Sequence, residues 1–186
     1  MIEPTPAAQL IKAFVNTVDL ENGQDDVASP DELARWLAAR QLGPASLRLT
    51  DEQHAVFLEL RAGFREALDP GHPVFPHHLA RADAILADAP VLVTVTRAGP
   101  ERPLAPAPGL PEARTALARL AVAWAELVLT GQIHRLKRCA EHTCQGAFWD
   151  SSRNHSRRWC SMRLCGNRTK ARRYAARQRP QRPQRP

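Results

Sequence analysis

The segment Arg135–Arg177 reads RLKRCAEHTCQGAFWDSSRNHSRRWCSMRLCGNRTKARRYAAR, and it decides how the rest of the chain is interpreted. It holds every cysteine of the protein, at Cys139, Cys144, Cys160 and Cys165, with the spacing C-x4-C-x15-C-x4-C. Two close pairs of thiols are typical of a zinc site. Four thiolates fill the tetrahedral shell of Zn²⁺ and leave no open position, so we expect a single structural ion. A disulfide pair or four free thiols are the alternatives.

Three histidines near the cysteines offer other ligands. His134, His142 or His155 could replace a cysteine, because imidazole nitrogen also binds Zn²⁺. With four cysteines present, we expect these histidines to be surface or phosphate-facing side chains instead.

The same segment predicts a small loop–hairpin–helix module of the treble-clef type. Ala147–Trp149 and the pair Arg158–Trp159 are predicted to supply a short hairpin and a small apolar core beside the metal. Ser161 can cap a helix that starts at the second cysteine pair, and Gly166 lets the backbone turn close to the metal. About 45 residues cannot hold a large core, so zinc should supply much of the folding energy.

Charge divides the chain at the same place. The net charge of the 186 residues is +7, but residues 1–133 hold 11 basic and 17 acidic residues, a net −6. Residues 134–186 hold 15 basic and 2 acidic residues, a net +13. Such asymmetry indicates a polyanionic partner, most often nucleic acid, although a solubilising basic tail is the alternative. Most of the cations are arginines, whose planar fork suits phosphate and guanine edges.

Eight cations of this module are candidate nucleic-acid contacts. The predicted helix carries Arg168, Lys170, Arg172 and Arg173, and the flanking backbone carries Arg153, Arg157, Arg158 and Arg163. Five to seven phosphate contacts would give a slope of log K against log salt of roughly −4 to −6. The alternative role is to neutralise the formal −2 charge of a zinc ion with four thiolates. Gln178–Pro186 repeats QRP three times and predicts a disordered tail.

The N-terminal part predicts mainly helices. Capping patterns start at Ser29, with Glu32 three residues later, and at Thr50, with Gln53. Periodicity predicts further helices over Pro6–Val18, Pro76–Ala87 and Pro111–Thr130, the last of them ended by Gly131. The predicted buried residues include Ile11, Phe14, Trp36, Leu37, Phe57, Phe64, Leu120, Trp124, Leu127 and Val128.

One strand signal accompanies these helices. Val91–Thr96 is rich in β-branched residues, and Arg102–Ala105 could return as the second strand of a hairpin. The predicted fold class is therefore mainly α with a small β-hairpin (α+β), a helical N-terminal domain followed by a treble-clef-like zinc finger.

Residues 1–133 contain no motif of a catalytic set. There is no Gly-rich phosphate loop, no G-x-S-x-G and no H-E-x-x-H, so we expect no enzyme. No apolar run approaches the ~18–20 residues of a membrane span, and the first ten residues do not resemble a secretory signal. A cytoplasmic protein is therefore expected.

Two polar sites in this part allow a functional interpretation. Asn16 and Asp19 end the first helix and could line a ligand pocket, although a C-terminal cap and a turn are the alternative. His77 and His78 could bind metal, but adjacent positions do not face each other on a helix, so a solvated turn is favoured.

The module resembles a known family. Cys165–Arg168 is the CGNR signature, and the flanks Ser152–Asn154, Ser156–Met162 and Lys170–Arg172 are similar to the CGNR-type zinc finger throughout. In that family the finger follows a domain called ABATE, described as a stress-induced transcription regulator. Phe14–Asp19, Leu33–Leu37 and the helix leading into Arg135–Cys139 are similar to ABATE domains. Gln145–Trp149 departs from the family, where a Gly after the second cysteine and a more aliphatic strand are expected.

The resemblance implies an ABATE-like domain over 1–133, a CGNR-type finger over 134–177 and a tail over 178–186. It implies a DNA-binding regulator associated with the nucleoid. The N-terminal domain would be regulatory, with a possible small-molecule effector and a possible homodimer. The alternative is an RNA-binding or protein-interaction finger. In that case Phe148, Trp149 and Trp159 would be exposed and stack on unpaired bases, instead of forming the finger's own core.

Overall fold

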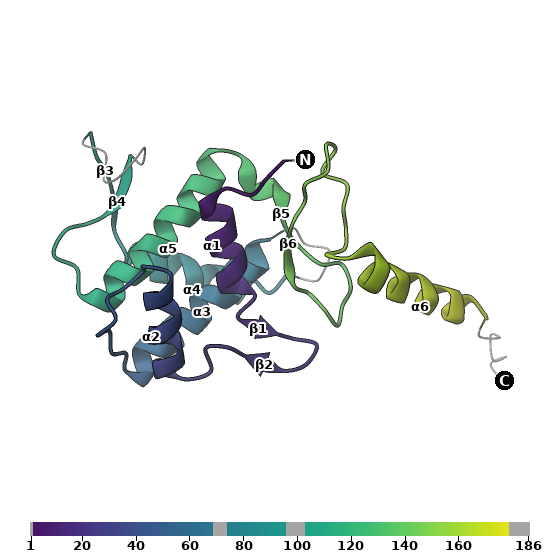
Figure 1. Cartoon of the computed structure of the whole chain (residues 1–186), viewed down its shortest axis with the longest axis horizontal. Helices are drawn as coiled ribbons and strands as arrows, with labels where there is room; N and C mark the ends of the chain where they lie inside the picture. Colours follow the sequence, from purple (N-terminus) through teal and green to yellow (C-terminus); the bar gives the residue numbers. More distant parts are fainter. Residues whose placement is uncertain (1, 69–73, 96–102, 179–186) are drawn as a thin grey trace.

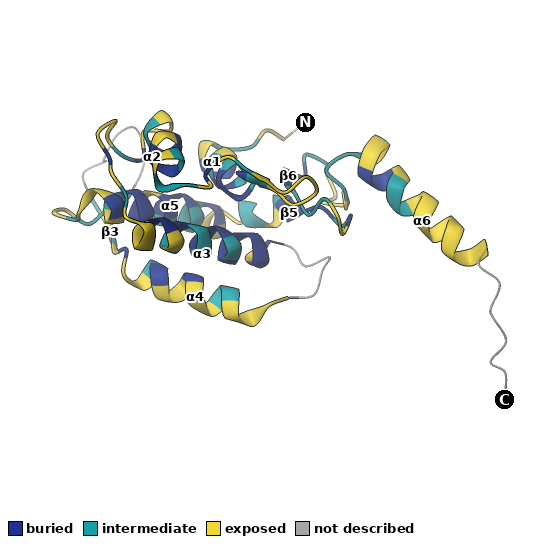
Figure 2. Cartoon of the chain, turned by 90° about the horizontal axis from the view of Figure 1, so that it is seen from below, coloured by how far each residue is buried: buried dark blue, intermediate teal, exposed yellow. Residues whose placement is uncertain are grey.

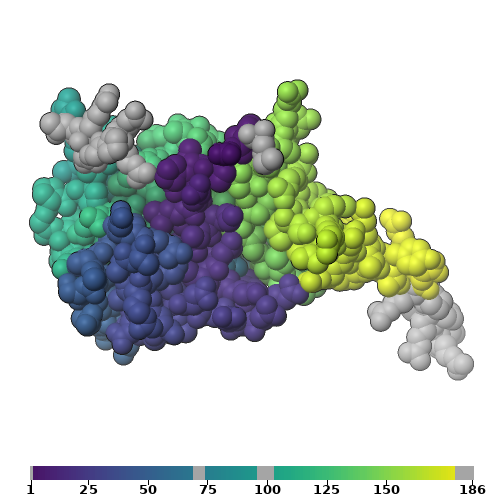
Figure 3. Space-filling model, in the orientation of Figure 1, coloured from purple at the N-terminus to yellow at the C-terminus, as the bar shows by residue number. Residues whose placement is uncertain are grey.

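The computed structural model describes residues 2–68, 74–95 and 103–178, and the helical body and the cysteine-bearing segment lie side by side in it (Figure 1). The body's helices are α1 (Pro6–Val15), α2 (Pro30–Ala39), α3 (Asp51–Ala67), α4 (Pro76–Ala87) and α5 (Glu112–Leu129). A last helix, α6 (Asn167–Gln178), projects away from the body, as Figure 3 also shows. None of the described helices is long and apolar enough to cross a membrane. The predicted tail lies beyond the described residues, apart from its first residue, Gln178, which ends α6.

The predicted helix starts are confirmed. At the start of α2, Ser29 Oγ accepts the N–H of Glu32 at 3.3 Å, and the Glu32 carboxylate accepts the N–H of Ser29 at 2.9 Å. Thr50 and Gln53 form the same capping box at the start of α3. Gly131 ends α5 with φ 68°, a left-handed conformation that suits glycine. α1 ends at Val15 rather than Val18, because the chain then enters a strand.

Within the described residues, three two-stranded antiparallel sheets accompany these helices. β1 (Val18–Asp19) pairs with β2 (Gln24–Asp25), and β3 (Val91–Val93) pairs with β4 (Leu104–Pro106). The latter confirms the predicted hairpin with shorter strands, although part of each predicted strand lies in 96–102, outside the described residues.

The third sheet corrects a prediction. β6 (Ala147–Trp149) pairs with β5 (Leu136–Arg138), and not with Arg158–Trp159. Leu136 and Trp149 are opposite each other and both pack into the body's core, which favours this pairing. Arg158 makes a single backbone contact nearby, where its carbonyl accepts the N–H of Ala140 at 2.8 Å.

The main core lies between α1, α2, α3 and α5, whose inner faces are buried in Figure 2. Phe64 stacks on Trp124 with ring centroids 4.4 Å apart, and Phe14 contacts both Phe64 and Trp36. α4 packs closely on α3 because Gly63 has no side chain. A Cβ there would lie 2.2 Å from that of Ala82.

The β5–β6 hairpin lies between the body and the cysteine segment and contributes side chains to the cores of both. Successive side chains of a strand point to opposite faces. Ala147 and Trp149 accordingly join the main core, while Phe148 packs with Cys139 and Cys165 in a second, smaller core. The hairpin, the loops that follow and α6 give the treble-clef-like arrangement that the sequence predicts.

Candidate metal centre and nucleic-acid interface

The four cysteine sulfurs converge as the spacing predicts. All four Sγ atoms lie within 4.8 Å of one another, 3.7 Å apart for Cys144 and Cys160 and 3.6 Å for Cys160 and Cys165. A tetrahedral Zn²⁺ with Zn–S bonds of ~2.3 Å requires sulfur–sulfur edges of about 3.8 Å. The sulfurs are therefore already spaced for such an ion.

Each cysteine is positioned by local structure. Cys139 follows β5, and its sulfur accepts the backbone N–H of Cys160 at 3.4 Å. Cys165 lies in η2, a single π-helical turn over Met162–Gly166, whose start Ser161 caps by accepting the N–H of Leu164. This confirms the predicted capping role. Gly166 permits close packing here, since a Cβ would lie 2.5 Å from the sulfur of Met162.

The close packing of the thiols also affects their acid–base state. A hydrogen bond with Cys139 and burial raise the pKa of Cys144, and burial raises that of Cys165 to about 12. The four cysteines would hold Zn²⁺ as thiolates, so binding of the ion would release their protons. The four cysteines thus form one structural zinc site, and the described histidines contribute nothing to the cluster.

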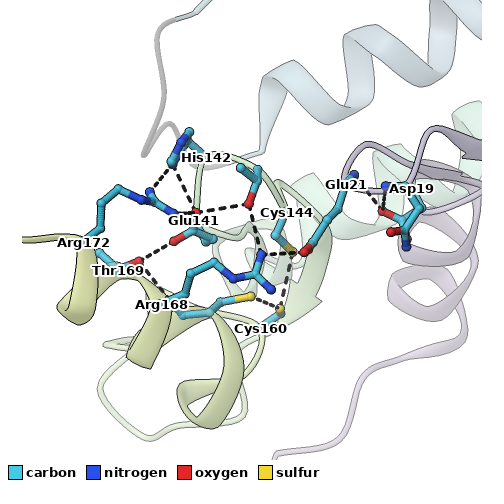
Figure 4. Close-up of polar contacts among 12 residues, drawn as sticks. Asp19, Glu21, Glu141, His142, Cys144, Cys160, Arg168, Thr169 and Arg172 are labelled. Atoms are coloured by element: carbon cyan, nitrogen blue, oxygen red, sulfur yellow. Dashed lines mark hydrogen bonds and ion pairs between the residues drawn. The ribbon is translucent and has the colours of Figure 1, made fainter.

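Glu141 organises the polar side of this centre (Figure 4). Its fully buried carboxylate accepts hydrogen bonds from Arg172 at 2.6 Å and from Thr169 at 2.7 Å. Burial alone would raise the pKa of Glu141, but these hydrogen bonds outweigh it and lower the pKa to about 2. Arg172 also contacts His142. This network fastens α6 to the loop between the first two cysteines.

Three of the eight candidate cations have internal partners. Arg172 is held by Glu141, and Arg168 forms an ion pair with Glu21 of the β1–β2 loop at 2.6 Å. The guanidinium of Arg157 donates to the carbonyl of Cys160 at 2.7 Å. These contacts give the three arginines structural roles.

The other five cations are exposed. Within the described residues their side chains form no ion pair or hydrogen bond: Arg153, Arg158, Arg163, Lys170 and Arg173. Lys170 and Arg173 lie on α6, which has no buried residue and stands clear of the body (Figures 1 and 2). Arg158 also lies over the Trp159 ring, 5.6 Å from its centroid. The structure therefore leaves five of the predicted contact residues without an ionic or hydrogen-bonding partner among the described residues.

The aromatic rings near the centre are largely covered. Phe148 is 5% exposed and Trp149 8% exposed, each within one of the two cores. Trp159 is half-buried, and its Nε1 donates to Thr169 at 3.1 Å. Phe148 and Trp159 pack in the finger's own core, as the second of the two alternatives expects, whereas Trp149 packs into the core of the body instead.

Asn16 and Asp19 have structural partners. The Asn16 amide donates to the carbonyl of Ala147 at 2.8 Å and accepts the N–H of Ala147 at 2.7 Å, as a neighbouring strand would. The Asp19 carboxylate accepts the N–H groups of Glu21 and Asn22 and so fixes the β1–β2 loop. Neither residue lines the groove beside α1 and α5 or the cavity between α3, α4 and α5. Their role in a ligand pocket stays a prediction.

A buried charged cluster behind the centre is not predicted by the sequence reasoning. Arg61 of α3 forms a bidentate ion pair with Asp25 at 2.7 Å, and Arg138 of β5 pairs with Glu66 at 3.3 Å. Burial lowers the pKa of Arg65 to about 10, and Cys144 acts in the opposite direction. Arg61 and Arg65 lie four residues apart on the otherwise apolar face of α3, and this spacing is the sequence signal that could have indicated the cluster.

A helical body joined through a shared hairpin to a four-cysteine, treble-clef-like centre defines a two-part zinc-finger protein. The chain belongs to the ABATE family, described as "Putative stress-induced transcription regulator", which matches residues 9–131. Residues 135–178 match the CGNR zinc finger. A search of curated proteins finds no match.

Proposed function

We propose that this protein is a DNA-binding transcription regulator whose zinc finger contacts the duplex. The observation that carries the proposal is the set of five exposed, unpaired cations on and beside α6, around a metal centre that fixes their positions. Arginine and lysine side chains of this kind supply the phosphate contacts that dominate affinity for DNA.

The charge of the body supports one direction of approach. Residues 1–133 carry a net −6 and would repel a polyanion, whereas residues 134–186 carry +13. DNA would therefore meet the finger first, with Lys170 and Arg173 on a helix that no other described element covers. Such a regulator would work at the nucleoid and have no catalytic role.

The burial of Phe148 and Trp149 favours DNA over the alternative of single-stranded RNA. Proteins that bind unpaired bases present aromatic faces for stacking. Here those faces pack into the two cores. A protein-interaction finger is the remaining alternative, and a competition experiment separates it from DNA binding.

We further propose that the N-terminal domain is regulatory. Two contacts could carry a signal to the finger, namely Asn16 to Ala147 and Glu21 to Arg168. Asn16 and Asp19 stay candidates for an effector site. Division into 1–133, 134–177 and a tail, and assembly as a homodimer, are likewise proposals.

A salt titration with matched variants tests the DNA proposal. Anisotropy of labelled genomic duplexes is measured with the zinc-loaded full chain between 50 and 200 mM salt, a range typical for such titrations. Five phosphate contacts predict a slope of log K against log salt of about −4.5. The variant Lys170→Gln/Arg173→Gln should lower affinity and reduce the slope by about 2. Arg35→Gln, an exposed arginine of α2, is the control and should change neither.

Competition completes the test. Unlabelled duplex DNA should displace the labelled fragment, and single-stranded RNA of equal length should do so poorly. Affinity that is independent of salt, or that favours the RNA, contradicts the proposal. Selection of bound fragments from genomic DNA, with the double variant as control, would then define the sequence that is read.

A further inference from the structure

The body carries an open groove far from the cysteines in sequence and built from other elements. It has a volume of about 1050 Å³ and lies between α1, β4, α5 and the residues that follow α2. Its walls are largely apolar, formed by Leu10, Ala13, Leu42, Leu104, Pro106 and Val122. Small-molecule sites are concave, mainly apolar and carry a few convergent polar groups, with volumes up to about 1,000 Å³.

The charged residues that line this groove are two arginines. Arg40 and Arg119 both line it, and neither forms an ion pair within the described residues. The Arg119 guanidinium donates to the carbonyl of Gln41 at 2.8 Å, and that of Arg40 lies 4.0 Å above the Trp36 ring. Burial lowers the pKa of Arg40, and the charge of Asp26 opposes this. Because Arg40 and Arg119 are the charged residues among those that line the groove, its lining carries a positive charge.

A strained residue lies between the two arginines. Gln41 follows α2 with φ 59°, and its N–H and that of Leu42 bond to the carbonyls of Ala38 and Leu37. Glycine is the usual residue at this position of a helix end, because a side chain there is strained. Here the position holds a glutamine whose side chain lines the groove. Strain of this kind often accompanies a binding site.

A second cavity provides a comparison. It has a volume of about 450 Å³, lies between α3, α4 and α5, and also contains two arginines, Arg81 and Arg114. Those arginines form ion pairs with Glu59 at 2.6 Å and Asp88 at 3.9 Å. Among the residues that the structure describes, the cations of the larger groove have no acidic partner of this kind. We therefore infer that their charge is available to a ligand.

We propose that this groove binds an amphipathic carboxylate, with the carboxylate between Arg40 and Arg119 and the apolar chain along Leu10, Ala13 and Val122. Arginine's fork donates paired hydrogen bonds to a carboxylate, and the walls cover an aliphatic chain. This site supplies a chemical class for the effector of the proposed function. It does not rest on DNA binding, because ligand binding is measured without nucleic acid.

Decanoate, kept below its micelle concentration, is the probe, and calorimetry on the zinc-loaded full chain is the measurement. Saturable binding of one decanoate per chain is expected. Decyltrimethylammonium has the same chain with a cationic head, and it should not bind. Because Arg40 lies on the Trp36 ring, decanoate should also change tryptophan fluorescence. Trp36→Phe should remove that change while calorimetric binding persists.

Variants of the rim test the role of charge. Arg40→Gln should weaken binding of decanoate about ten- to hundred-fold, the range for a hydrogen bond to a charged group. Among the described residues, the Arg40 side chain donates one hydrogen bond, a 3.4 Å contact with the carbonyl of Trp36, so the variant should stay folded. Arg40→Lys should retain part of the affinity, and Arg35→Gln on the same helix should bind as the wild type does.

Three results would each overturn the proposal. These are no saturable binding of decanoate, equal binding by Arg40→Gln and the wild type, and equal binding of the cationic analogue. None of them bears on the salt-dependent binding of DNA, so the two proposals fail separately.

Discussion

The left-handed backbone conformation of Gln41 should lower the stability of the folded protein. Gln41→Gly should raise the free energy of unfolding by about 0.5–1 kcal/mol. Relief of left-handed strain, about 1–2 kcal/mol, exceeds the extra entropy that glycine gives the unfolded chain, about 0.4–1 kcal/mol. Urea denaturation provides the measurement. Gln41→Ala keeps the strain and removes the amide, so it should bring no gain. Equal stabilisation by both variants would show that strain is not the cause.

Asp150 is the residue through which pH should act on the finger. Its buried carboxylate accepts bonds from Ser152 at 2.6 Å, Lys137 at 3.1 Å and the N–H of Arg157 at 3.0 Å. Burial would raise its pKa, but the hydrogen bonds lower it from 3.8 to about 2. Because the folded state holds the proton less tightly, this stability is complete above pH 3.8 and is lost as the pH falls towards 2.

The variant Asp150→Asn tests that prediction. At pH 7 it should unfold with a free energy lower by about 2 kcal/mol. The difference from the wild type should stay constant down to about pH 5 and narrow below 3.8. Denaturation curves measured at a series of pH values give the difference directly. A gap of constant size at all pH values would assign the loss to packing instead of charge.

At the scale of elements, α6 depends on contacts at its first turns. A helix of 12 residues with no buried residue is marginal in water by itself. The Thr169 hydroxyl lies between Trp159 and Glu141 and bonds to both. Thr169→Val keeps the shape and removes both hydrogen bonds, which should cost about 1–3 kcal/mol. Hydrogen exchange of the α6 amides should accelerate.

The control for this helix is Thr130→Val at the end of α5, where the hydroxyl bonds only to carbonyls of its own helix. Exchange in α6 should be unchanged in this variant. If Thr169→Val also left α6 protected, the Glu141 network would not be what holds the helix.

The helices could be predicted because their signals are local. The two capping boxes lie within four residues each, and Pro76–Ala87 has the predicted bounds of α4. β1 and β2 are two-residue strands, too short to show an alternating pattern, and Asn22-Gly23 between them is the turn signal that could have indicated this hairpin. Val128 is predicted to be buried but is 49% exposed, since periodicity does not say where neighbouring helices end.

The zinc ligands could be predicted for the same reason, because the spacing of the cysteines in the sequence indicates them. Which cations form internal ion pairs could not be predicted. Arg168 meets Glu21, which lies 147 residues away, and Arg172 meets Glu141 across 31 residues. Such pairs depend on the tertiary arrangement, which composition and spacing do not determine. The sequence thus predicted a basic surface and not which of its charges are free.

At the scale of the whole molecule, Asn16 holds the body to the hairpin. Asn16→Ala would leave the N–H and carbonyl of buried Ala147 without their partner, which should lower the free energy of unfolding by about 2 kcal/mol. The Ala147 amide should exchange faster with solvent. Asn22→Ala changes the same residue type on the exposed β1–β2 loop and should have little effect. Slow exchange at Ala147 in Asn16→Ala would contradict the assignment.

Removal of zinc should unfold the finger but leave the helical body folded. Chelation, or the substitution Cys160→Ser, should release the loops between Cys139 and Cys165 together with α6, because their small core is built on the sulfurs. α1–α5 should keep their helicity, since the main core contains none of the cysteines. Circular dichroism and hydrogen exchange after chelation make the comparison. Loss of all helices at one midpoint would mean a single cooperative unit.

The alternation along β6 has a consequence for recombination of such domains in evolution or in the laboratory. Ala147 and Trp149 fit the pocket of one particular body, while Phe148 between them fits the metal-bearing part. If the finger were fused to an unrelated domain, the apolar side of β6 that packs against the body would therefore be exposed to water. Trp149 also donates to the carbonyl of Ile2, near the opposite end of the chain. A functional chimaera should therefore exchange the finger together with the helical body against which β6 packs.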